Sequence, residues 1–229
     1  MRSPIRRIAV LALLLAPTLA VAQNPDGEKE AVRRTPAMEA AEAVSLAAAL
    51  AAYGRRNEAP QALLAAASIL LDHAAPLRPL AGGDSLAGPP LPPLDAAVLI
   101  AEAEQFIGDD VALQQQAAAL RARPAPAPPP PTRGAEDGPV RYATAAEGRG
   151  QQRLTLPFRG RETATIHLIG DGASDLDYYL YDVNGDLVAS DEGPSDSATL
   201  FWYVPYRQEL TLRVRNRGPR RNAYHIVIN

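Results

Sequence analysis

The chain has 229 residues, no cysteine, and 26 acidic against 23 basic side chains, which gives a net charge of −3. The lack of cysteine excludes disulfides, thiol catalysis and thiolate metal sites. The mild acidity argues against a nucleic-acid-binding protein, because such proteins normally carry a basic surface.

Residues 1–22 have the pattern of a secretory signal peptide. Arg2, Arg6 and Arg7 precede a short apolar run, and Ala20-Val21-Ala22 supplies the small residues that signal peptidase reads. Pro17 interrupts the run, which is shorter than the ~20 residues needed to span a bilayer. We therefore expect export to the periplasm or the cell exterior, with no transmembrane anchor. Cleavage removes three arginines and no acid, which leaves a net charge of −6.

The region 37–123, which follows a polar flexible leader at 23–36, is expected to be α-helical. Four runs rich in alanine and leucine are typical of helices, at about 37–53, 61–73, 95–107 and 111–123. Gly54 suits the end of the first helix, and Asp95 suits an N-cap for the third. A proline- and glycine-rich break at 76–93 separates them into two helical hairpins. A plain four-helix bundle and a degenerate repeat both remain open. The likeness to tetratricopeptide repeats is weak, because the unit spacing and the signature residues do not match.

The alanine content of these helices limits the area that each can bury. The larger side chains are therefore expected to form most of the helical core: Leu46, Leu50, Tyr53, Leu63, Leu64, Ile69 and Leu70. A unit of this kind should be marginally stable alone, which suggests either a partner protein or docking on the C-terminal domain.

Residues 124–139 form a proline-rich linker. Pro124, Pro126 and the run 128–131 favour an extended polyproline helix, which would act as a stiff spacer. Recognition by a proline-binding module is the alternative interpretation.

Residues 140–229 show the period of two that is typical of strands with one buried face. Leu176, Tyr178 and Leu180 alternate with polar or tyrosine residues, and Asn184-Gly185 then suits a tight hairpin turn. Similar short runs recur at intervals of roughly 8–12 residues, with turn residues between them. The predicted fold class is a multidomain α plus β protein, in which helical hairpins and a linker precede an antiparallel β-sandwich of jelly-roll type.

The order GRETATIHLIGDGASDLDYYLYDVNGDLVASDEG, with NAYHIVIN at the end, resembles the pre-peptidase C-terminal domain family. The most specific part is Asp175-Leu176-Asp177 leading into Tyr179-Leu180-Tyr181, with Tyr224 near the chain end. Gln208-Glu209-Leu210 departs from the Gly-x-Tyr that the family usually carries there. The resemblance implies a non-catalytic β-sandwich of an exported protein, with a role in targeting, solubility or substrate binding.

Acidic residues gather around one hairpin, and Asp175, Asp177 and Asp191 are the candidate ligands of a Ca²⁺ ion. Carboxylate oxygens suit this hard cation, although no EF-hand loop with a closing glutamate is present. The alternative is that these residues serve strand starts and turns. No other cofactor is expected.

A candidate binding surface consists of Tyr179, Tyr181, Arg213 and Arg215. The arginines share one sheet face and could attract an anionic polysaccharide or lipid head group, while outward tyrosines could stack on sugars. The alternatives are a solvated edge strand protected by charge and ordinary cross-strand pairs of tyrosines.

No catalytic residue is predicted. His73, His167 and His225 lie in different elements, and no serine stands in a Gly-x-Ser-x-Gly turn. We expect an interaction or adaptor protein whose helices meet another protein and whose sandwich meets a cell-surface polymer. A carbohydrate- or polymer-binding accessory module is the alternative, and an unrecognised hydrolase is a third hypothesis.

Overall fold

The computed structural model describes residues 35–79, 91–124 and 139–229. The predicted signal peptide, nearly all of the leader and most of the linker lie outside these residues. The described part contains four helices, α1 (Pro36–Asn57), α2 (Pro60–Asp72), α3 (Ala96–Ile107) and α4 (Val111–Arg121). They are followed by the strands β1 (Val140–Ala146), β2 (Gln151–Phe158), β3 (Glu162–Gly170), β4 (Leu176–Tyr181), β5 (Leu187–Asp191), β6 (Ser197–Val204), β7 (Gln208–Asn216) and β8 (Asn222–Ile228).

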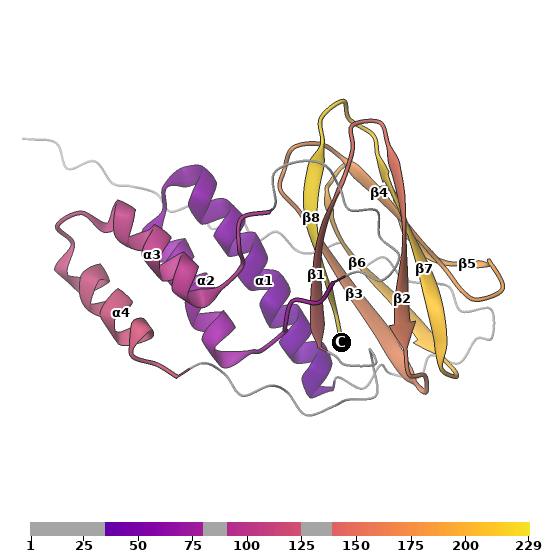
Figure 1. The fold of residues 1–229 in the computed structure, drawn as a ribbon, viewed down its shortest axis with the longest axis horizontal. Coiled ribbons are helices and arrows are strands. Elements are labelled where there is room, and N and C mark those ends of the chain that lie inside the picture. The colour runs from indigo at the N-terminus through magenta and orange to yellow at the C-terminus, as the bar shows by residue number, and fades with distance from the viewer. Residues whose placement is uncertain (1–34, 80–90, 125–138) are drawn as a thin grey trace, which may run out of the picture.

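The strands form two antiparallel sheets, and the helices cover one of them (Figure 1). The sheet beside the helices has the order β1-β8-β3-β6 and is called the helix-side sheet here. The second sheet, called the far sheet, has the order β2-β7-β4-β5. These two orders are those of an eight-stranded jelly roll. The predicted fold class is therefore confirmed.

Alternating apolar side chains fill the space between the sheets, as the period of two predicts. Two fully buried tyrosines meet at its centre, where the rings of Tyr178 and Tyr224 lie 6.3 Å apart in an edge-to-face arrangement. The hydroxyl of Tyr178 donates to the carbonyl of Asp196 at 2.7 Å. The hydroxyl of Tyr224 donates to Oε1 of Gln152 at 2.7 Å. Both polar groups are thus satisfied inside an apolar core.

Capping side chains define the helix starts. Oδ1 of Asp95 accepts from the backbone N–H of Ala97 and Val98, which confirms the N-cap predicted for α3. The first helix, in contrast, does not end at Gly54 but continues to Asn57 and closes with Glu58 in the left-handed conformation. Gly54 is buried instead, and it allows α2 to approach α1.

The composition of the helical core differs from the expectation. Leu63 and Leu64 are fully buried as predicted, but Leu46 is 54 % exposed and Tyr53 is 53 % exposed. The buried positions of α1 are mostly alanine, together with Met38, Val44 and Gly54. The reason is that α1 lies between α2 and the helix-side sheet and must pack closely on two sides.

The helical layer docks on the sandwich through α1, which packs on β3 and β8. Ile169 and Val227 of these strands belong to the same buried cluster as the helices. The buried guanidinium of Arg141 donates to the carbonyl of Leu94 at 2.6 Å, which ties the start of α3 to β1. Of the two alternatives that the alanine-rich helices suggested, docking on the C-terminal domain is the one observed.

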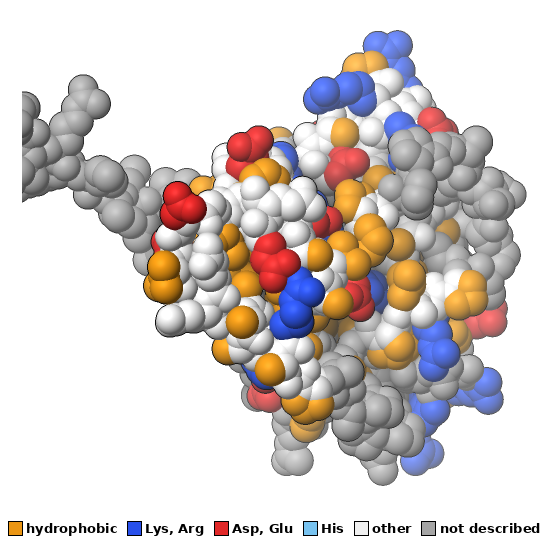
Figure 2. Space-filling view, turned by 60° about the vertical axis from the view of Figure 1, so that its left-hand side comes forward, with side chains coloured by type: hydrophobic (Ala, Val, Ile, Leu, Met, Phe, Trp, Pro, Cys, Tyr) orange, Lys and Arg blue, Asp and Glu red, His pale blue; other side chains and the backbone are white. Residues whose placement is uncertain are grey.

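The outward side of the helical layer is mixed in character. Figure 2 shows hydrophobic side chains scattered among polar and charged ones over the helices. Within the described residues, no helix combines the length and the apolar character that crossing a bilayer requires.

Candidate functional site

The outer face of the far sheet carries the predicted binding surface. Register pairing places Arg153, Arg213 and Tyr179 side by side on β2, β7 and β4. The next row contains Thr155, Thr211 and Tyr181. We call the outward side chains Arg153, Tyr179, Tyr181, Arg213 and Arg215 the tyrosine–arginine face.

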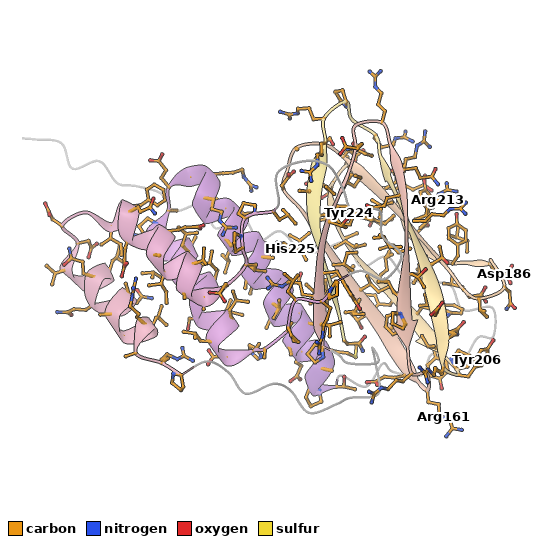
Figure 3. All side chains as sticks on the ribbon, in the orientation of Figure 1. Arg161, Asp186, Tyr206, Arg213, Tyr224 and His225 are labelled. Carbon is orange, nitrogen blue, oxygen red and sulfur yellow. The ribbon has the colours of Figure 1, made fainter. Side chains whose placement is uncertain are left out.

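Arg213 is the centre of this face. Its guanidinium carbon lies 4.8 Å from the ring centroid of Tyr179 and 5.9 Å from that of Tyr181. Both distances suit a cation–π interaction. Figure 3 shows Arg213 pointing away from the sandwich, on the side opposite to the helices. The stacking thus places one planar cation against two aromatic rings.

Three arginines of the face are opposed by one buried carboxylate, that of Asp177, which stands opposite Arg215 in the β4–β7 register. Arg153 stands directly opposite Arg213 in the β2–β7 register, and like charges at such positions repel. Within the described part of the chain, Arg153, Arg213 and Arg215 form no ion pair. Nε of Arg213 is buried and has no hydrogen-bond acceptor among these residues. The face therefore has an excess of positive charge that can attract an anionic group.

The alternative interpretation of Arg213 and Arg215 was that they lie on a solvated edge strand and protect it by their charge. That interpretation is wrong, because β7 lies between β2 and β4 inside the far sheet. Tyr179 and Tyr181 do stand in cross-strand pairs, as the other alternative expected. Their partners on β7 are Arg213 and Thr211 rather than other tyrosines.

Asp177 lies on the same outer face but is only 2 % exposed. Its Oδ2 accepts from the hydroxyl of Tyr179 and from Nη1 of Arg217, each at 3.4 Å. Burial raises the pKa of Tyr179, and the carboxylates of Asp177 and Glu192 raise it further. Tyr179 is therefore a neutral hydrogen-bond donor at physiological pH.

The three predicted calcium ligands are not on one side of the far sheet. Asp177 is on the outer face, whereas Asp191 pairs with Tyr178, whose side chain points into the core. Burial raises the pKa of Asp175, as do the nearby carboxylates of Asp177, Asp196 and Asp191, while Arg217 opposes this shift. In residues 35–79, 91–124 and 139–229, no group of three or more histidine or acidic side chains is arranged to hold a metal ion. Calcium binding stays a prediction.

Two buried histidines lie between the helical layer and the sandwich, and sequence reasoning missed this role. Figure 3 shows His225 facing α1, whereas Tyr224 beside it in β8 points between the sheets. His167 of β3 faces the same side, and its Nδ1 lies 3.1 Å from Oγ1 of Thr199. Burial lowers the pKa of His167 to about 4, and burial together with the charges of Arg141 and Arg55 lowers the pKa of His225 to about 4. The period of two in β3 and β8 predicts that His167 and His225 point out of the sandwich. It does not predict that the helical layer covers them.

A cavity of about 250 Å³ lies between α3 and α4, far from both features, and its lining is Glu104, Ile107, Gly108, Gln114 and Ala117. This lining combines one carboxylate with an amide and apolar groups. It contains no pair of groups for nucleophilic or acid–base chemistry.

No protein-family model and no curated protein sequence matches the chain. Among solved structures, it is similar to the pre-peptidase C-terminal domain of a collagenase from Bacillus anthracis, with 9 % identity and a TM-score of 0.34 over 39 % of this chain and 88 % of that one. This is the family that residues 140–229 resemble in sequence.

Two further structures match the same share of the chain. A mitogen from Yersinia pseudotuberculosis has 10 % identity and a TM-score of 0.30, with 39 % of this chain and 83 % of that one covered. PliG from Aeromonas hydrophila, a periplasmic inhibitor of g-type lysozyme, has 11 % identity and a TM-score of 0.30, with 39 % and 85 % covered.

Proposed function

We propose that the chain is an exported, non-enzymatic binding protein whose tyrosine–arginine face holds an anionic polymer of the cell surface. The observation that carries this proposal is the stack of Arg213 between Tyr179 and Tyr181, directly opposite a second arginine that has no acidic partner among the described residues. Planar cations and aromatic rings together suit a ligand that has both carboxylate or sulfate groups and apolar sugar faces.

The arrangement of the layers supports a binding role on this side. The helices occupy the opposite side of the molecule (Figure 1), so the far sheet presents its outer face without obstruction from them. An extended polymer can follow the strands, because the tyrosine–arginine face lies on the outside of the far sheet. Export through residues 1–22 would bring this face to cell-surface polymers.

The test is calorimetric titration of the full chain with polygalacturonate, a polyanionic sugar polymer, and with uncharged dextran. We expect the chain to bind polygalacturonate and not dextran. Arg213→Gln should weaken the binding of polygalacturonate about tenfold or more, since charge-assisted hydrogen bonds contribute about 1.5–3 kcal/mol. Arg220→Gln is the matched control, because Arg220 is exposed in a loop and its loss changes the net charge equally. Equal weakening in both variants would show that only net charge matters and would refute the proposed face.

A second candidate is the adaptor role, in which the helical layer meets a partner protein. The observation favouring it is that Leu46 and Tyr53, seven residues apart and hence on one side of α1, are both about half exposed. A photoreactive residue at position 46 in cells should give one adduct of defined mass, and the same residue at exposed Ala112 of α4 should not. Identical adduct patterns at both positions would contradict this role.

A further inference from the structure

The two edges of the helix-side sheet differ in their protection. At the β1 edge, residues 76–78 run alongside the strand, where N–H of Arg141 donates to the carbonyl of Pro76 at 3.0 Å and N–H of Arg78 donates to the carbonyl of Arg141 at 2.8 Å. At the other edge, β6 pairs with β3 on one side only. Among the described residues, no strand covers its second side.

The ladder identifies the backbone groups that face this open side. N–H of Gly170 donates to the carbonyl of Asp196 at 3.0 Å, so the even-numbered residues of β6 point their backbone groups toward β3. The odd-numbered residues therefore point theirs away. Ser195 Oγ accepts from N–H of Ser197 at 3.1 Å, whereas no described residue accepts from the N–H of Thr199, Phe201 or Tyr203.

The side chains of β6 do nothing to prevent pairing. The strand reads Ser-Ala-Thr-Leu-Phe-Trp-Tyr-Val, without a charge, proline or glycine over eight residues. Natural edge strands usually carry lysine, proline or a bulge that blocks another chain. An uncharged edge of this length is instead a template for antiparallel addition of a strand.

The order of side-chain sizes identifies a second copy of this chain as the occupant. A two-fold axis at Leu200 places Ser197 opposite Tyr203 and Thr199 opposite Phe201 on the outer surface. On the core side it places Ala198 opposite Trp202. Each large side chain then faces a small one, and the residues with outward backbone groups face each other, as an antiparallel ladder requires.

We propose that the chain forms a two-fold dimer in which the β6 strands pair antiparallel about Leu200 and join the two helix-side sheets. The assembly is closed, because the remaining edges of the joined sheet are the β1 strands that residues 76–78 accompany. The axis is perpendicular to the sheet, so both tyrosine–arginine faces point to the same side. The dimer does not depend on the proposed ligand, but it would add avidity for a polymer.

The test is the molar mass of the full chain by light scattering over a range of concentrations, with two double variants at exposed Ser197 and Tyr203. Wild type should have twice the 24.3 kDa mass of one chain. Ser197→Lys/Tyr203→Lys should be monomeric, because lysines face each other at both ends of the pairing. Ser197→Glu/Tyr203→Lys should be dimeric, because the same register then pairs opposite charges.

Three results would overturn the proposal. A monomeric wild type at its highest soluble concentration would exclude the dimer, and a wild type that instead binds an extended peptide along β6 would assign the edge to another protein. A dimer that persists in the two-lysine variant would place the interface elsewhere. Circular dichroism of each variant, matched to wild type, verifies that a monomer is still folded.

Discussion

Gly54 of α1 and Leu63 of α2 are packed so closely that a Cβ atom at Gly54 would lie 2.7 Å from Cγ of Leu63. The contact lets two alanine-rich helices bury area against each other although their side chains are small. A glycine in a helix interior is otherwise unfavourable by about 1 kcal/mol relative to alanine. The position therefore shows that close approach outweighs helix propensity here.

Gly54→Ala should destabilise the protein in spite of the better helix propensity of alanine. The added methyl group must displace fully buried Leu63, and overpacking of this kind costs about 1–3 kcal/mol. Urea unfolding measures the change in the free energy of unfolding. Gly193→Ala is the control, since its Cβ would meet one side-chain oxygen at 3.3 Å; a loss no larger at Gly54 than at Gly193 would contradict the packing argument.

Ile169→Ala should weaken the attachment of the helical layer to the sandwich. Ile169 is 6 % exposed and belongs to the helical cluster although it lies on β3. Removing its side chain should lower the free energy of unfolding by about 2–4 kcal/mol. Leu187→Ala, at a position that is 53 % exposed, should change it by less than about 0.5 kcal/mol. Equal effects would show that the helical layer does not pack on Ile169.

Acid should destabilise the molecule through His167 and His225. Their pKa values are about 4 in the folded state and about 6.5 when unfolded, so the unfolded chain binds more protons between these values. Stability is then fully present above pH 6.5 and declines as the pH falls toward 4, by roughly 3 kcal/mol for each histidine. Urea unfolding at several pH values measures this decline.

The matching control for the acid effect is His167→Gln/His225→Gln, which has no imidazole at the interface. Its free energy of unfolding should depend less on pH across the same interval. If wild type and this variant lose stability in parallel, the interface histidines do not cause the decline.

Asp177→Asn should strengthen binding of polygalacturonate about threefold. The change removes a negative charge from the tyrosine–arginine face while the side chain keeps its size, and a charge effect near the surface amounts to about 0.5–1 kcal/mol. Asp186→Asn, at the exposed hairpin tip (Figure 3), changes the net charge equally and should leave the affinity unchanged. Tighter binding by both variants to the same degree would argue against a ligand on this face.

The sequence predicted those parts of the structure that local patterns encode. Alternation placed Leu176, Tyr178 and Leu180 in the core, and side-chain chemistry placed the cap at Asp95. It also placed Tyr179 and Arg213 outward, but only the pairing of β4 with β7 brings them into contact. Strand order depends on contacts between residues far apart in the sequence, so the central position of β7 and the edge position of β6 could not be deduced.

The burial of side chains in the helical layer was also not predictable from local sequence. Leu46 and Tyr53 were expected in the core because size and apolar character usually decide burial. The structure buries the alanines of α1 instead, since this helix contacts both α2 and the sheet. The burial of His167 and His225 could not be predicted for the same reason, because nothing in the sequence of β3 or β8 indicates that α1 lies over them.

Hydroxyl-radical footprinting of the full chain with and without polygalacturonate tests the central claim most directly, because oxidation of each tyrosine reports its contact with the polymer. The account predicts protection of Tyr179 and Tyr181, with unchanged oxidation of Tyr53 on α1 and Tyr206 in the β6–β7 loop, both about half exposed. Bound polymer that leaves Tyr179 and Tyr181 as reactive as before would contradict it.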